Sequence, residues 1–188
     1  HGSPVFSAAF SPDGKLVANV TFDGEVAVTP VGGGNRKVLI RLPRKQFGIS
    51  LAAAPGRLVV GTSAGAVWLV PTGGGRPYVL GRHTAGTKVT DVSFNRDWTR
   101  VISGGEDGYA YIWNLASGRS IRLRHQPPVY GATFSPDGRR VATAALDGRV
   151  RVWNSTTGAP IGRPLEVVVG QALASVRFSA DGRRVVTT

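Results

Sequence analysis

The sequence predicts an all-β protein, a β-propeller of four-stranded antiparallel blades with an incomplete ring. Three observations lead to this fold class. A Phe-Ser-Pro-Asp-Gly motif returns at regular intervals, and an Asp-Gly turn with an alternating strand follows it in most copies. The chain also has 26 Gly and 12 Pro among 188 residues, which favours many short strands joined by turns.

The repeat is defined by the turn motif that ends its first strand. The motif at 10–14 returns at 134–138 and, as Phe-Ser-Ala-Asp-Gly, at 178–182, with a degraded copy at 94–98. The Phe residues are separated by 84 (94 − 10), 40 (134 − 94) and 44 (178 − 134) positions, and 84 is two periods of 42. The missing copy is expected at 52–56, where Gly56-Arg57 aligns with Gly14-Lys15. Periods of this length indicate a repeat architecture.

Each period contains the pattern of four strands. In the fourth copy the predicted strands are Val129–Phe134, Arg140–Ala144, Val150–Trp153 and a Pro-bearing edge strand, Pro160–Leu165. Asp147-Gly148 is a tight hairpin dipeptide, and the third strand alternates apolar side chains with Arg151. The third copy follows the same pattern and ends with a strand at Ser120–Arg124.

Sheets of four antiparallel strands that stack on copies of themselves are propeller blades. We place the blades of this single segment at about 1–42, 43–83, 84–125 and 126–168, with a partial blade of two strands at 169–188. A ring of four and a half blades leaves two sheet faces open. We therefore expect further blades of a longer parent chain, or self-association, to close the ring.

With these motifs the chain resembles the WD-repeat family. The resemblance rests on Ser-Pro-Asp-Gly, on Asp-Gly and on Val-Arg-Val-Trp-Asn at 150–154, where Trp-Asn replaces Trp-Asp. It is strong in copies three and four and weaker in copies one and two, where Thr29-Pro30 and Val70-Pro71 stand instead of Trp-Asn. The chain is similar to the WD-repeat regions of bacterial multidomain signalling proteins, which implies a non-enzymatic, cytoplasmic interaction module.

The resemblance gives the recurring polar residues a structural role. In the family, a His before the first strand bonds the turn Asp, a strand-two Ser or Thr and the strand-three Trp. Carried onto this sequence, the tetrads are His83, Ser103, Asp107 and Trp113, and His125, Thr143, Asp147 and Trp153. A set that returns in successive repeats serves the fold, whereas an enzyme needs only one active site. Buried polar networks stabilise a fold when every member is satisfied.

Residues that vary between copies are the candidates for partner binding. In the family, the positions four and six before the strand-one Phe line the mouth of the propeller, a usual partner surface. These positions and one further polar residue give the candidates Phe6, Gln46, Lys88, Thr90, Asp91 and Tyr130. Phe6 and Tyr130 stand out because exposed aromatic side chains are typical interface anchors. The alternative is that they pack against neighbouring blades.

The charge leaves a second function open. The chain has 23 Lys and Arg against 11 Asp and Glu, a net charge of +12, which suits nucleic acid or another polyanion. The basic residues are scattered, which favours an ordinary solvated surface. Without Cys, thiol catalysis and thiolate metal sites are excluded. No carboxylate pair or metal-spaced cluster stands apart from the repeat, so we expect no cofactor, no metal and no enzymatic activity.

Together these features predict a protein–protein interaction scaffold or sensor module that presents a partner-binding face. Two alternatives remain. One is polyanion binding through the basic surface. The other is a non-catalytic propeller domain within a larger signalling NTPase, kinase or hydrolase.

Overall fold

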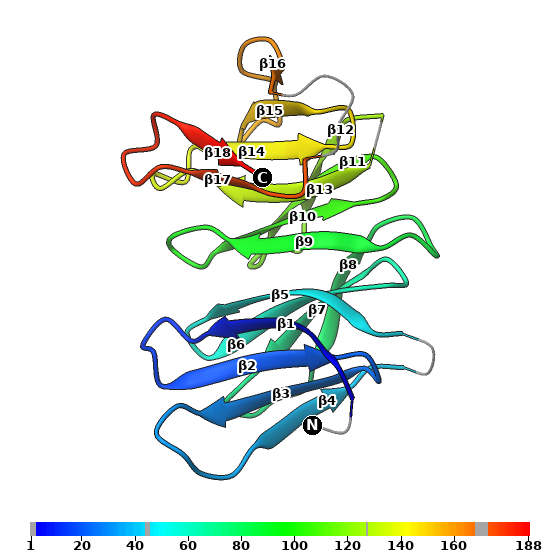
Figure 1. Ribbon diagram of the computed structural model, residues 1–188, viewed down its shortest axis with the longest axis vertical. Helices are drawn as coiled ribbons and strands as arrows, with labels where there is room; N and C mark the ends of the chain where they lie inside the picture. The colour runs from blue at the N-terminus through cyan, green and yellow to red at the C-terminus, as the bar shows by residue number, and fades with distance from the viewer. Residues whose placement is uncertain (1–2, 44–45, 127, 168–172) are drawn as a thin grey trace. The chain divides into compact units, whose positions relative to one another are not determined.

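Every regular element in the described part of the chain is a β-strand (Figure 1). The computed structural model describes residues 3–43, 46–126, 128–167 and 173–188. These ranges contain no helix that is long and apolar enough to cross a membrane. The chain divides into two compact units, His1–Val89 and Thr90–Thr188.

Unit 1 is built from two antiparallel sheets, each with its four strands in chain order. The first sheet contains β1 (Val5–Phe10), β2 (Leu16–Thr21), β3 (Glu25–Pro30) and β4 (Lys37–Arg41). The second contains β5 (Gly48–Ala54), β6 (Arg57–Thr62), β7 (Ala66–Pro71) and β8 (Tyr78–Arg82). Turn glycines with left-handed backbone, such as Gly24 (φ 83°) and Gly65 (φ 80°), join strands two and three of each sheet.

Unit 2 repeats this pattern and adds a hairpin. One sheet contains β9 (Val89–Phe94), β10 (Arg100–Gly105), β11 (Tyr109–Asn114) and β12 (Ser120–Arg124). The next contains β13 (Val129–Phe134), β14 (Arg140–Ala145), β15 (Arg149–Asn154) and β16 (Leu165–Glu166). The hairpin contains β17 (Val176–Phe178) and β18 (Val185–Thr187). Four blades and two strands of a fifth confirm the predicted fold class, an incomplete β-propeller.

The predicted fourth strand of copy four was wrong in extent. Only the two residues of β16 pair with β15 along Arg149 and Val150, and Pro160 forms an isolated bridge to Trp153. The physical reason is that Pro160 and Pro164 lack the backbone N–H that a ladder requires. The strand predicted at Ser120–Arg124 is present over those residues.

The predicted alignment of copy two was wrong by one residue in each of its first two strands. Phe10 pairs with Val17 in the first sheet, and Ala53 pairs with Leu58 in the second. Ala53, rather than Ala52, therefore occupies the position of the strand-one Phe, and Arg57 is equivalent to Leu16. The turn between these strands is two residues shorter, because Pro55-Gly56 (Gly56 φ 71°) reverses the chain directly.

Close approach between sheets defines the cores. In unit 1, Val20, Val26, Leu58 and other buried side chains of β2, β3, β6 and β7 form one cluster. Gly48 makes this packing fit, because a Cβ there would lie 2.1 Å from a methyl carbon of Val20. In unit 2, a second cluster gathers around Ile102 and Val141 and includes the Trp153 ring.

Candidate functional site

Three phenylalanine rings form an exposed stack on unit 1, here called the aromatic cluster. Phe6 lies in β1, Phe22 in the β2–β3 turn and Phe47 immediately before β5. The ring centroids are 5.7 Å apart for Phe6 and Phe22, 5.2 Å for Phe6 and Phe47, and 4.9 Å for Phe22 and Phe47. Phe6 is still 47% exposed and Phe22 54% exposed. The rings therefore cover one another only in part and present apolar surface to water.

Backbone hydrogen bonds hold the three rings together. The Phe22 N–H donates to Pro4 O (2.9 Å), and Ser63 N–H donates to Phe47 O (2.9 Å). A Cβ on Gly24 would lie 2.6 Å from Gln46 O, so only glycine lets the segment before β5 pack on the β2–β3 turn. This packing brings Phe47 onto Phe22.

The strand register corrects one candidate at the mouth. Val5 pairs with Thr21 and Gly48 with Thr62, so Phe47 rather than Gln46 is equivalent to Pro4. The Gln46 side chain is half-buried, and its Oε1 has no hydrogen-bond partner among the described residues. Phe22 and Phe47 are the residues that sequence reasoning missed. Aligning Thr62 with Thr21 and allowing a two-residue deletion in the preceding turn places Phe47 at the position of Pro4.

The other mouth candidates have different environments. Lys88 is exposed. In unit 2, the Thr90 hydroxyl donates to Val129 O, and Asp91 accepts from the Ala132 N–H (3.0 Å) and from Arg177 Nη1 (3.4 Å). Burial raises the pKa of Asp91. Thr90 and Asp91 thus connect β9 to neighbouring strands. Tyr130 is half-buried in β13.

The polar residues of copy four form a connected chain. Trp153 Nε1 donates to Thr143 Oγ1 (2.8 Å), and that oxygen lies 2.7 Å from His125 Nε2. At the other ring nitrogen, Arg151 Nη1 lies 3.1 Å from His125 Nδ1. Arg151 Nη2 also donates to Asp147 Oδ2 (2.8 Å). Arg151 therefore stands between the histidine and the aspartate that the resemblance paired directly.

The hydrogen-bond donor next to Nδ1 fixes the tautomer of His125. A guanidinium can only donate, so Nδ1 accepts and the proton is on Nε2. Nε2–H then donates to Thr143 Oγ1, whose own hydrogen points to Arg151 O (3.3 Å). Burial, reinforced by the positive charge of Arg151, lowers the pKa of His125 to about 3. The pKa of Asp147 is lower than its ordinary value. Burial alone would raise it, but the hydrogen bond and the charge of Arg151 outweigh burial. A histidine that stays neutral and fully bonded serves packing.

Copy three keeps part of the same arrangement. Trp113 Nε1 donates to Ser103 Oγ (2.8 Å), as Trp153 does to Thr143. Asp107 accepts from the backbone N–H of Tyr109 (3.2 Å). At the position of Arg151 stands Tyr111, which stacks on Trp113 with centroids 5.1 Å apart. His83 is buried in unit 1, where its backbone N–H donates to Gly65 O (2.8 Å).

No metal centre emerges from the described ranges, since no group of three or more His, Asp or Glu side chains there is placed to share an ion. The repeated polar sets are occupied with their own hydrogen bonds, and the aromatic cluster has no acid, base or nucleophile among its rings. The exposed rings of the aromatic cluster can pack against apolar groups of a ligand.

Comparisons with known proteins agree with the fold. The family model "WD domain, G-beta repeat" matches residues 1–28, 74–114 and 118–154. The meiotic recombination protein rec14 of Schizosaccharomyces pombe is 30% identical over 124 residues, 64% of this chain. The match covers 40% of that relative, so the chain spans well under two thirds of its length.

A solved structure shares the architecture over the whole chain. The computationally designed Ika8 protein superposes with a TM-score of 0.81 at 25% sequence identity. The match covers 100% of this chain and 56% of the designed chain.

Proposed function

The chain belongs to the WD-repeat family, and from that premise we propose that it binds a segment of a partner protein through the aromatic cluster. WD-repeat propellers are in general protein-interaction scaffolds and are typically non-catalytic. The observation that carries the proposal is the exposed stack of Phe6, Phe22 and Phe47. Aromatic side chains that keep about half their surface in water are the usual anchors of protein interfaces.

The geometry of the cluster favours an apolar anchor on the partner. The rings of Phe6, Phe22 and Phe47 are nearly parallel, with interplanar angles of 20°, 19° and 25°. Such a stack presents ring edges and faces on which another aromatic or a branched aliphatic side chain can pack. The supporting backbone is fixed by the bonds to Pro4 and Ser63, so binding would cost little ordering of the site.

Peptides selected from a displayed library on the immobilised 188-residue chain test this proposal. We expect a selected peptide to lose at least tenfold in affinity with Phe22→Ala and with Phe6→Ala, which is about 1.4 kcal/mol for each. Phe22→Ala is the sharper variant because Phe22 lies in a turn and is mostly exposed. Circular dichroism and the melting temperature show whether the fold is kept.

Tyr130→Ala is the control, since this aromatic lies in unit 2. If Phe6→Ala and Phe22→Ala leave the affinity of the peptide unchanged and Tyr130→Ala abolishes binding, the partner site is in β13. The proposal that the aromatic cluster binds the partner would then be wrong. Binding that falls steeply between about 50 and 200 mM salt would instead support the polyanion alternative.

Further proposals concern the blades, the location and the parent protein. We propose the blade boundaries given above, a cytoplasmic location and a role as a non-catalytic module attached to a signalling enzyme. An uncovered face supports the need for more blades or a second copy. Phe10 is 65% exposed, and with Val5 and Val31 it lines a hollow of about 480 Å³ along the first sheet.

A further inference from the structure

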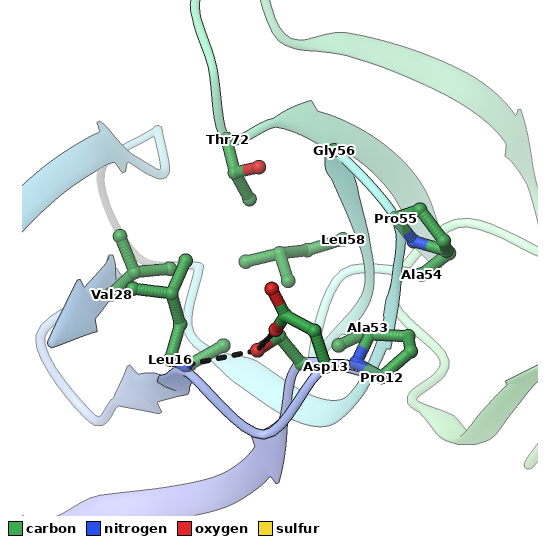
Figure 2. A pocket seen from close by; sticks show the side chains of 12 residues that line it. Pro12, Asp13, Leu16, Val28, Ala53, Ala54, Pro55, Gly56, Leu58 and Thr72 are labelled. Atoms are coloured by element: carbon green, nitrogen blue, oxygen red, sulfur yellow. Dashed lines mark hydrogen bonds between the residues drawn. The ribbon is translucent and has the colours of Figure 1, made fainter. Parts of the chain in front are cut away.

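Unit 1 contains a cavity of about 530 Å³ at the end where strand one turns into strand two. It lies between the β1–β2 and β5–β6 turns, and Figure 2 shows the side chains around it. Its floor is apolar, with Leu16, Val28 and Leu58 among the lining residues. Among the described residues, the polar side chains that line it are Ser11, Asp13 and Thr72. This volume lies in the range of ligand sites.

At the equivalent place in unit 2 an arginine lines a smaller hollow of about 390 Å³. Arg100, the first residue of β10, donates through Nη1 to Ser155 O and Oγ (both 3.0 Å) and through Nη2 to Gly138 O (2.9 Å). Its guanidinium lies 5.4 Å from the Phe134 ring centroid. Arg140, the first residue of β14, repeats this with Gly182 O (2.7 Å) and the Phe178 ring (5.6 Å).

Both halves of that arrangement are replaced in unit 1. The strand register makes Leu16 equivalent to Arg100 and Arg140. Each is the first residue of strand two, and each pairs with the last residue of strand three, which is Pro30, Asn114 or Asn154. Leu16 therefore stands where the arginine would be. Ala53 stands where Phe134 lies in the fourth blade. Where the guanidinium and the ring are absent, the hollow is about 530 Å³ rather than about 390 Å³.

The acceptor side of the arginine site is kept. The register makes Pro71 equivalent to Asn154, so Thr72 is equivalent to Ser155. The Thr72 hydroxyl therefore lines the cavity at the position of Ser155 Oγ, which accepts from Arg100 in unit 2. Asp13 belongs to the same turn position as Asp137. Its Oδ1 accepts from Ser11 Oγ (2.6 Å) and Lys15 N–H (3.1 Å), and Figure 2 shows its carboxylate directed into the cavity.

Asp13 differs from Asp97 and Asp137 in its charged neighbours. The Ser135 bond lowers the pKa of Asp137 most, and Arg140 adds to it; the Thr99 bond and Arg100 act in the same way on Asp97. For Asp13 the Ser11 bond lowers the pKa most, and the charge that adds to it is Lys15. The repeat thus provides a guanidinium beside Asp97 and Asp137, and Leu16 beside Asp13.

We propose that this cavity binds one arginine side chain from an extended segment of a partner protein. The aliphatic stem packs on Leu16 and Leu58, and the guanidinium donates to the Asp13 carboxylate and toward Thr72. Because the chain carries a net charge of +12, a polybasic segment is repelled. The occupant is a single arginine among neutral or acidic residues. This site extends the proposed interaction function, but it shares no residue with the aromatic cluster, so each proposal can fail alone.

The test uses the blocked tripeptide acetyl-Glu-Arg-Gly-amide and its counterpart with citrulline, which keeps the shape and loses the charge. Each is titrated into the ¹⁵N-labelled chain, and amide shifts are followed by NMR. We expect saturable shifts around Leu16, Ala53, Gly56 and Thr72, and at least tenfold weaker binding of the citrulline peptide. Asp13→Asn should bring the arginine peptide down to the citrulline level. Leu16→Arg, which restores the residue of unit 2, should abolish binding because its own guanidinium takes the acceptors that the ligand needs.

Asp181→Asn is the matched control, because Asp181 accepts from Ser179 Oγ (2.6 Å) as Asp13 does from Ser11. Its variant should bind as the wild type does. Equal binding of both peptides, equal losses with Asp13→Asn and Asp181→Asn, or shifts outside the cavity would each overturn the proposal. If Leu16→Arg fails to fold, the comparison of Asp13→Asn with Asp181→Asn still decides.

Discussion

His125 carries its proton on one nitrogen only, and its neighbours decide which one. Arg151 Nη1 donates to Nδ1 of His125. A proton on Nδ1 would remove this hydrogen bond and place two positive charges next to each other. Trp153, Thr143, His125, Arg151 and Asp147 then satisfy one another in series. The network is complete while the histidine is neutral.

The first prediction is a loss of stability in mild acid that depends on His125. Its folded pKa of about 3 lies below the ordinary value of 6.5. The unfolded chain therefore binds the proton first, and the free energy of unfolding falls as the pH drops from 6.5 toward 3. One proton gives a slope of at most about 1.4 kcal/mol per pH unit. Urea unfolding across this range measures it.

His125→Gln is the variant to compare, since it cannot titrate. The difference in slope between wild type and variant should appear in the upper part of this range, above the depressed pKa of Asp147. Parallel curves would mean that His125 is protonated in the folded chain and that the network is not formed as described.

At the residue scale, the repeat made part of the site predictable. Thr143, Trp153 and His125 lie together as the family pattern implies. Arg151 was missed because the pattern pairs His with Asp directly. Its signal was present in the register, since Arg151 stands opposite Thr143 on the neighbouring strand. Phe22 was missed because turn residues follow no alternation.

At the scale of elements, strands with flanking turn residues were placed well. β12 and β13 have the predicted bounds, because Gly and Asp turns punctuate an apolar alternation. Prediction failed at β16, where two prolines remove ladder donors, and at β5, where a shortened turn shifted the alignment. Both failures arise from backbone chemistry in turns and edges, which a motif search does not weigh.

The second prediction concerns how β10 is joined to the next blade of unit 2. Arg100→Leu, which copies the residue of β2, should lower the free energy of unfolding by about 1–3 kcal/mol, because hydrogen bonds from a charged donor are lost. Three described bonds and the contact with Phe134 disappear. Thermal unfolding of the whole chain measures this.

Arg139→Leu is the control for that experiment, since Arg139 is exposed and precedes the bonded Arg140. It should leave the melting temperature nearly unchanged. If Arg100→Leu and Arg139→Leu have the same melting temperature, Arg100 does not stabilise the contact between its own sheet and the next. The structural explanation of the cavity in unit 1 would then fail.

At the scale of the whole molecule, the repeat period made the architecture predictable before any contact was known. Each of the four full blades has the same four strands, so one well-defined copy identifies the others. The blade pattern does not determine which surface binds a partner. In this chain that information lies where copies depart from the pattern: three Phe residues in unit 1, and Leu16 with Ala53 in place of an arginine and a ring.

The last prediction is that the 188-residue chain associates through the outer face of its first sheet. Phe10, Val31 and Val5 are 65%, 53% and 44% exposed, and all three line one hollow. An apolar surface of this kind is covered at a gain of roughly 25 cal/mol per Å². Light scattering after gel filtration should give a mass above 19.7 kDa that falls on dilution. Phe10→Glu should shift it toward the monomer, because a buried charge opposes the contact.

Phe22→Glu separates this face from the aromatic cluster, since Phe22 does not line the hollow. It should leave the mass unchanged. A loss of association with Phe22→Glu and not with Phe10→Glu would make the aromatic cluster a self-association surface. A mass of 19.7 kDa for the wild type at every concentration would show that the open sheet face stays exposed to solvent in a stable monomer. In that case Phe10 provides no driving force for self-association, and partner binding can be measured directly on this chain.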